Sequence, residues 1–256
     1  MSTEVQPPER PRLPPGQLER MRRTRRHPRP TQFDGLHLRH LVDDIEQTLS
    51  SLPGPVNDVV DVFCGTRPYE DLLPSGARVI GYDIDNFYGA ADVTGFDFLP
   101  FDDESFDLVV CFEGFHYVED PVHGVSEIRR VLRPGGTALI TIPLVWEYDR
   151  ELLERRYTGP ELAHLFAGWD AVRVTENGGR AVAWALLTNR LIVLGEDALP
   201  GLGRRLLHPL FALAYLTVNL IGDRLDRIER KRVTSSLTLP MNLSLTARKP
   251  PEPAGS

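Results

Sequence analysis

The stretch 59-VVDVFCGTRPYEDLL-73 decides the fold, because it has the pattern of a buried strand that ends in a tight turn. Its first residues are β-branched valines around one aspartate, which favours a strand covered on both faces. A Cys-Gly-Thr turn follows, and the residues after it can begin a helix. A strand, a loop and a helix in this order are typical of a nucleotide-binding unit. Such loops are normally rich in glycine, yet this loop keeps only Gly65 and has Phe63 just before the turn.

Strand-like and helical segments alternate along the rest of the chain. The expected strands are 58–64, 78–85, 91–94, 106–112, 137–143, 170–176 and 238–248. The expected helices are 35–54, 121–132, 159–167, 181–194 and 203–231. This alternation predicts an α/β fold whose parallel sheet has helices on both faces. In such a sheet the carboxyl ends of the strands meet at one edge, where ligands bind.

Residues that suit ligand binding fall at that carboxyl edge. Gly65 follows the first strand, Asp83 comes at the end of the second, and Glu113 follows the fourth. A dinucleotide needs three loop glycines near its pyrophosphate, and two of the three are missing here, so a site for NAD or FAD is poorly supported. S-adenosylmethionine (SAM) carries no phosphate. Its binding requires one close backbone approach and one acidic side chain that accepts hydrogen bonds from the ribose hydroxyls. Gly65 can supply the approach and Asp83 the acid.

The order and spacing of four segments match a known family. The segments are 59-VVDVFCGTRPY-69, 79-VIGYDID-85, 99-LPFDDESFDLVVCFEGFHYVEDP-121 and 127-EIRRVLRPGGTALITIP-143. Over roughly residues 56–177 and the final strand, the chain resembles class I SAM-dependent methyltransferases. It is most similar to members from glycan or natural-product pathways, whose first loop has a basic residue where this chain has Arg67. The resemblance implies a Rossmann-like doubly wound sheet, mostly parallel with an antiparallel last strand, and a C-terminal helical insertion.

The resemblance also assigns the cofactor-binding positions. They are Asp61, Cys64, Gly65, Thr66, Asp83, Ile84, Asp97, Phe98, Glu113 and Gly114. The first four would surround the methionine tail of SAM, and Asp83 would accept the ribose hydroxyls. Ile84 would lie against the adenine, and either Asp97 or Phe98 would lie near its edge. Glu113 and Gly114 would lie beneath the transferable methyl group.

Phe63 is the departure from the family pattern, which has glycine at that position. Its ring either crowds the methionine tail and abolishes binding, or turns into the packing beneath the loop and leaves the backbone amides free. Because the acid, Gly65 and the later segments are present, we expect binding to be retained. The alternative function is a non-catalytic binding or scaffold protein with a degenerate SAM site.

Candidate catalytic residues follow the fourth strand. His116 is the first candidate for a general base, and Tyr117 stands beside it; a histidine that only makes structural hydrogen bonds is the alternative. Related proteins often carry a histidine after the fifth strand, whereas this chain has 146-WEYD-149 there. No cluster has the spacing of metal ligands, so we expect no metal. The expected reaction is methyl transfer to a small-molecule or glycan-like acceptor, at oxygen.

Composition and charge divide the chain into segments. The expected divisions are a disordered arm (1–30), a core (31–179), a helical insertion or cap (180–234), a closing strand (235–249) and a disordered tail (250–256). The arm carries a local charge of +5 while the whole chain carries −7, so the remainder carries −12. This acidic body argues against nucleic-acid binding. Because there is no signal-peptide pattern, we expect a cytoplasmic protein.

The insertion contains an apolar run that admits more than one role. Residues 206–222 have no charge apart from a protonated His208, and arginines flank the run within 204–227. That arrangement suits a helix at a membrane surface. A helix that covers the core, or the matching face in a homodimer, is the alternative that we favour from the sequence.

Overall fold

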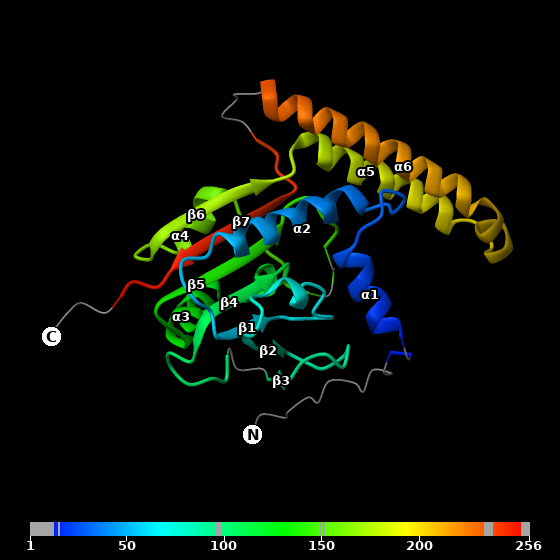
Figure 1. The fold of residues 1–256 in the computed structure, drawn as a ribbon. Coiled ribbons are helices and arrows are strands. Elements are labelled where there is room, and N and C mark those ends of the chain that lie inside the picture. Colours follow the sequence, from blue (N-terminus) through cyan, green and yellow to red (C-terminus); the bar gives the residue numbers. More distant parts are fainter. Residues whose placement is uncertain are drawn as a thin grey trace.

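One seven-stranded sheet forms the centre of the molecule (Figure 1). The computed structural model describes residues 13–14, 16–95, 99–148, 150, 152–232 and 238–251. The strands are β1 (Asp58–Val62), β2 (Arg78–Asp83), β3 (Val93–Thr94), β4 (Phe106–Phe112), β5 (Leu132–Pro143), β6 (Asp170–Asn177) and β7 (Asn242–Arg248). Their order is β3-β2-β1-β4-β5-β7-β6, and only β7 runs antiparallel to its neighbours. The doubly wound sheet expected from the sequence is confirmed.

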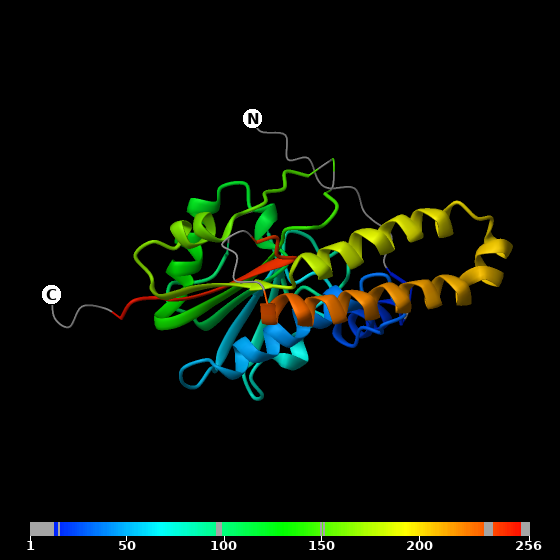
Figure 2. The ribbon, with the colours of Figure 1, turned by 90° about the horizontal axis from the view of Figure 1, so that it is seen from above.

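Helices cover both faces of this sheet (Figure 2). They are α1 (Gln17–Arg26), α2 (Gly35–Ser50), α3 (Pro121–Val131), α4 (Gly159–Leu165), α5 (Arg180–Asp197) and α6 (Gly201–Arg232). Leucines of α2 pack with β1 and β4 on one face, while α3 and α4 pack on the other. Asp120 caps α3, and Thr158 and Glu161 form a capping box on α4.

Two local features differ from the sequence-based expectation. The helix that could follow β1 is reduced to a 3-10 turn, η1 (Glu70–Leu72), because Pro68 and Pro74 bracket the segment. The arm expected to be disordered over 1–30 contains the helix α1. A second 3-10 turn, η2 (Phe115–Tyr117), follows β4.

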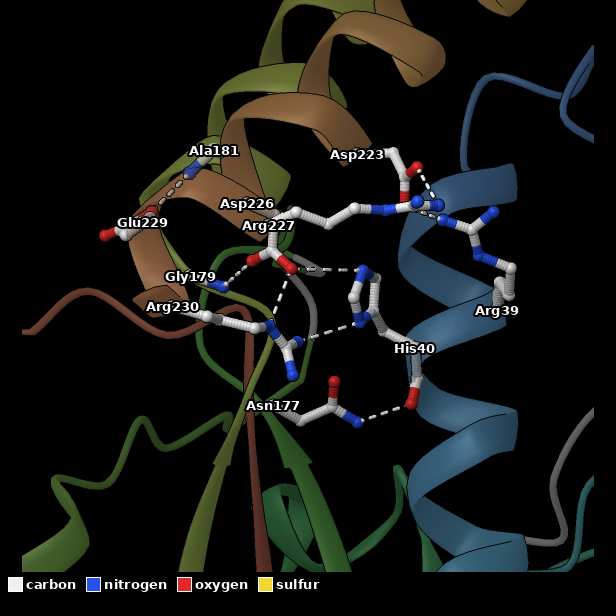
Figure 3. Close-up of polar contacts among 10 residues, drawn as sticks. All are labelled: Arg39, His40, Asn177, Gly179, Ala181, Asp223, Asp226, Arg227, Glu229 and Arg230. Atoms are coloured by element: carbon white, nitrogen blue, oxygen red, sulfur yellow. Dashed lines mark hydrogen bonds and ion pairs between the residues drawn. The ribbon is translucent and has the colours of Figure 1, made fainter. Parts of the chain in front are cut away.

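Helices α5 and α6 form an antiparallel hairpin between β6 and β7 that projects past the edge of the sheet (Figures 1 and 2). Figure 3 shows how the base of this hairpin is fixed to the body. The buried carboxylate of Asp226 accepts hydrogen bonds from the Gly179 amide at 3.2 Å and from Arg230 at 2.7 Å. It also lies 3.8 Å from the ring of His40 on α2. The base is therefore held by a buried charge network, whereas the distal half extends beyond it.

Candidate functional site

Asp83 joins the ends of β1 and β2 at the carboxyl edge of the sheet. One carboxylate oxygen accepts a hydrogen bond from the Gly65 amide at 2.8 Å, and the other accepts one from the Ile84 amide at 2.8 Å. Burial raises the pKa of Asp83, and the two backbone donors oppose that effect. Each oxygen keeps further acceptor capacity, so the carboxylate can still bind hydroxyl groups.

The surroundings of Asp83 suit an adenosine group. Gly65 has a left-handed φ of 52°, and a side chain built there would meet no atom within 4 Å, so the backbone is open to a close approach. Ile84 beside the carboxylate is 49% exposed. A carboxylate, a bare backbone position and an accessible aliphatic surface therefore lie together, as the sequence predicted.

Phe63 lies in the left-handed region, with φ 55°. Glycine is favoured there because a side chain in this conformation is strained. The partly buried side chain packs against the main hydrophobic core, and a methyl group placed on Gly114 would lie 2.7 Å from the Phe63 Cβ atom. Only glycine at 114 leaves room for this contact, which favours the interpretation that the ring is part of the packing.

The other loop residues lie beneath Gly65. Asp61 is buried at the end of β1, and burial raises the pKa of its carboxyl group to about 7, although Arg67 acts in the opposite direction. Cys64 is a buried thiol, and its amide donates a hydrogen bond to the carbonyl oxygen of Tyr82. The carbonyl oxygen of Thr66 accepts a 2.6 Å hydrogen bond from an arginine of α1.

Glu113 follows β4 and faces residues that the sequence analysis did not select. Its amide donates to Thr141, and its carboxylate accepts a 3.3 Å hydrogen bond from Asn242 on β7. Burial raises the pKa of Glu113 to about 7, and Arg25 is the strongest influence in the opposite direction. The pKa of Arg25 is raised first by Tyr69 and then by Glu113. Helix α1 contains so many arginines that nothing in the sequence singled out Arg25.

His116 and Tyr117 lie on η2, beside the end of β4. His116 is buried, and burial lowers its pKa to about 4, so the imidazole is neutral at neutral pH. Its Nε2 atom lies 3.9 Å from a carboxylate oxygen of Glu154, which also pairs with Arg156 at 2.8 Å. Tyr117 is exposed, and its ring centroid lies 4.0 Å from that of His116. The loop after β5 thus brings an acid to His116.

The structure cannot place every assigned position. Asp97 and Phe98 lie outside the described residues. Across the residues that are described, no group of three or more His, Cys, Asp or Glu side chains is arranged to hold a metal ion.

Comparisons with known proteins agree with this geometry. A family model described as a methyltransferase domain matches residues 60–140. A demethylmenaquinone methyltransferase of Mycobacterium sp. (strain JLS) is 36% identical over 182 residues, which cover 57% of this chain and 78% of that protein. One from Chlorobaculum tepidum is 35% identical over 102 residues, which cover 34% of this chain and 41% of that protein. The chain therefore spans less than half of the length of some of its curated relatives.

Solved structures show the same fold at low sequence identity. A candidate sarcosine dimethylglycine methyltransferase of Galdieria sulphuraria gives a TM-score of 0.51 at 16% identity, covering 83% of this chain and 88% of that one. A candidate methyltransferase of Haloferax volcanii, solved with the Trm112 methyltransferase activator, gives a TM-score of 0.51 at 22% identity. It covers 90% of this chain and 97% of that one.

Proposed function

The chain belongs to the class I SAM-dependent methyltransferases, and we propose that it transfers the methyl group of SAM to a hydroxyl oxygen of a small-molecule acceptor. The observation that carries this proposal is the position of Asp83. Its carboxylate is held by the amides of Gly65 and Ile84 next to an open backbone and an exposed aliphatic side chain. When bound, SAM supplies a methyl group on a sulfonium, which is a good leaving group.

The residues at the carboxyl edge would hold the cofactor by their own chemistry. Asp83 would accept the ribose hydroxyls and Ile84 would contact the adenine. Asp61, Cys64, Gly65 and Thr66 would surround the methionine tail, whose ammonium group would stabilise the charged form of Asp61. Glu113 and Gly114 would lie beneath the reacting methyl group. Asp97 and Phe98 keep their assignment beside the adenine from the family resemblance alone.

His116 is the proposed general base. A neutral imidazole can accept the proton of an acceptor hydroxyl, and Glu154 lies close enough to stabilise the imidazolium that forms. Tyr117 lies at the exposed side of His116, where it would contact the acceptor. The acceptor is then a hydroxylated molecule. Glycan-like acceptors fit the subgroup resemblance, and the curated relatives named above are demethylmenaquinone methyltransferases, so both kinds belong in a first screen.

Calorimetry with SAM and S-adenosylhomocysteine tests the cofactor site. We expect the Asp83→Asn variant to bind at least about tenfold more weakly, since charge-assisted hydrogen bonds contribute about 1.5–3 kcal/mol. Asp85→Asn, which changes a neighbouring acid that caps the Phe87 amide, is the matched control and should bind like the unaltered chain. Circular dichroism checks that both variants fold. Absence of binding heat from the unaltered protein would favour the scaffold alternative.

Radiolabelled methyl transfer to the acceptor screen tests the second half of the proposal. With any acceptor that is methylated, His116→Asn should lower kcat by about 10²-fold or more while SAM binding stays unchanged. Equal kcat for the variant would remove His116 from the reaction and leave the cofactor site intact.

A further inference from the structure

The α5–α6 hairpin has a polar interior. The Asn189 amide of α5 donates a 2.9 Å hydrogen bond to Asn219 of α6, and the Tyr215 hydroxyl donates a 2.7 Å hydrogen bond to Glu196. The residues of α6 that are buried are Tyr215, Asn219, Gly222 and Asp226. A methyl group on Gly222 would lie 2.7 Å from the Cβ atom of Ala185, so the helices approach closely there.

The outward side of the same hairpin is apolar. Six leucines, exposed by 54–71%, form one stripe on each helix: Leu187, Leu191 and Leu194 on α5, and Leu206, Leu210 and Leu213 on α6. Their spacing of three or four residues places each set on one side of its helix. On α6 that side is about half a turn away from the buried polar residues. The usual arrangement of a surface helix is therefore reversed, with the polar side inside and the apolar side outside.

The leucine stripe of α6 faces away from α5, because the buried residues about half a turn from it contact α5. The base of α5 packs on Leu36 and Met241 through Val182 and Leu186, and α6 contacts α2 through an ion pair between Asp223 and Arg39. Helix α6 includes an 18-residue window with a mean hydropathy of 1.3, of which only 17% is buried within the structure. By length and composition the helix is able to cross a membrane. Its apolar side is therefore left without cover by the body.

The charges around the stripes identify the partner. Residues 198–222 contain no acidic residue and no lysine, and their formal charges are those of Arg204 and Arg205. Arg204 is already paired with Glu196 and Asp197, but residues 180–232 as a whole carry nine basic and five acidic residues, and anionic lipid headgroups would complement this net charge of +4. The outermost part of the hairpin holds an exposed Asp197–Arg204 pair at 3.1 Å, which disfavours burial in the bilayer centre.

From this combination we propose that the outward side of α6 docks in the interfacial layer of an anionic lipid membrane. The leucine stripe of α6 enters the boundary between headgroups and acyl chains, and the arginines remain at headgroup level. The polar contacts between the helices stay paired inside the hairpin, away from lipid. The proposal does not depend on the methyl-transfer reaction.

Flotation of the full chain with lipid vesicles tests the proposal. One vesicle preparation is phosphatidylcholine alone, and the other includes about 30% phosphatidylglycerol to supply the anionic surface. We expect flotation with the anionic vesicles and much less with the neutral ones. A triple variant with Leu206, Leu210 and Leu213 each changed to Gln should reduce the floating fraction at least about tenfold, since each leucine loses apolar burial.

The matched control changes exposed leucines elsewhere, namely Leu152, Leu153 and Leu239, to Gln. These side chains are exposed by 50–57%, so the control alters similar surface outside the hairpin. It should float like the unaltered chain, and unfolding curves verify that both triple variants fold. The proposal is overturned if the unaltered chain stays in solution with both vesicle types, or if the control loses flotation equally. It is also overturned if light scattering shows a dimer that only the hairpin variant disrupts, because the stripes would then belong to a second copy.

Discussion

At the scale of single residues, Asp61 shows a conflict between stability and binding. The fold buries this carboxyl group, and burial raises its pKa to about 7, with smaller contributions in the same direction from Glu70 and Asp83. Arg67 compensates only in part. A charged Asp61 therefore costs stability in the protein alone. The proposed site gives a reason for this cost, because the ammonium group of SAM would stabilise the charged form.

This conflict predicts a pH-dependent effect of Asp61→Asn. The pKa in the folded state, about 7, lies above the ordinary value of 3.8, so the folded chain holds the proton more tightly than the unfolded chain. The stability contributed by the protonated carboxyl group is lost as the pH rises from about 4 to about 7. The variant should therefore gain up to about 4 kcal/mol in free energy of unfolding at alkaline pH, and nothing at acidic pH.

Urea denaturation at about pH 8 and about pH 4 measures both values. The same variant should bind SAM more weakly at the higher pH. A gain of equal size at both pH values would contradict the explanation, because the ionised form of Asp61 would then not be the source of the cost.

The sequence predicted part of the site at this scale, and the reason differs from residue to residue. Asp83 and Gly65 were found because parallel strands bring their carboxyl ends to one edge. Glu154 was missed because it lies in an irregular loop, whose course no periodicity fixes. Arg25 was missed because it is one of many arginines in the arm, and only packing decides which of them is buried.

At the scale of elements, α6 shows what a periodic pattern leaves open. Its helical spacing was sufficient to predict a helix over 203–231, and the structure has Gly201–Arg232. The same spacing favoured burial of the leucines, yet Asn219 faces inward. Its amide donates to the carbonyl oxygens of Pro30 and Gln32 at 2.8 and 2.7 Å, and its oxygen accepts from Asn189. These partners lie far away in the sequence, so no local pattern could reveal them.

In a helix that buries its leucines, changing Leu220 would lower the free energy of unfolding more than changing Asn219. We expect the reverse order on α6. Asn219→Leu leaves two carbonyl oxygens without their donor and removes one of the two acceptors of the Asn189 amide, and should lower the free energy of unfolding by about 2–4 kcal/mol. Leu220→Asn is the matched control, since this leucine is exposed, and should change the free energy by less than about 0.5 kcal/mol.

Denaturant titration followed by circular dichroism measures the two variants. The double change of Asn189 and Asn219 to leucine should cost at least as much as Asn219→Leu, because the Phe33 carbonyl oxygen, which accepts a 2.7 Å hydrogen bond from the Asn189 amide, then loses its donor too. If Leu220→Asn proved the more destabilising of the two single changes, the inward position of Asn219 would be wrong.

At the scale of the whole molecule, opposite charges hold the arm to the body. The arm and the remainder of the chain differ in the sign of their net charge, and α1 uses its arginines to contact the loop that follows β1. Arg22 donates to the Thr66 carbonyl oxygen at 2.6 Å, and Arg26 pairs with Asp71 and Glu46 at 3.0 Å. The arginine and proline content of residues 1–30 suggested disorder. Composition alone does not show whether such a segment packs against the rest of the chain. The contacts that hold α1 come from residues far away in the sequence, namely Glu46, Thr66 and Asp71.

Arg25 makes the strongest test of this docking. Its guanidinium group lies among Tyr69, Glu113 and Asp34, which raise its pKa in that order, while burial lowers it. Arg25→Met keeps much of the volume and removes the charge, which leaves Glu113 without its cation. Because this charge is then lost from the contact between α1 and the body, α1 should detach. Hydrogen exchange should then accelerate at least about tenfold in peptides from residues 17–26 and remain slow in β4.

Arg23→Met is the matched control on the same helix, since Arg23 is exposed and, among the described residues, its side chain makes none of the hydrogen bonds or ion pairs that Arg22 and Arg26 make. It should leave the exchange of α1 unchanged. Amides of α1 that exchange in the unaltered protein as fast as those of an unstructured peptide would show that the arm does not dock. Slow exchange that survives Arg25→Met would instead assign the docking to Arg22 and Arg26, because those two arginines would then suffice to hold the helix on the loop and the acidic surface.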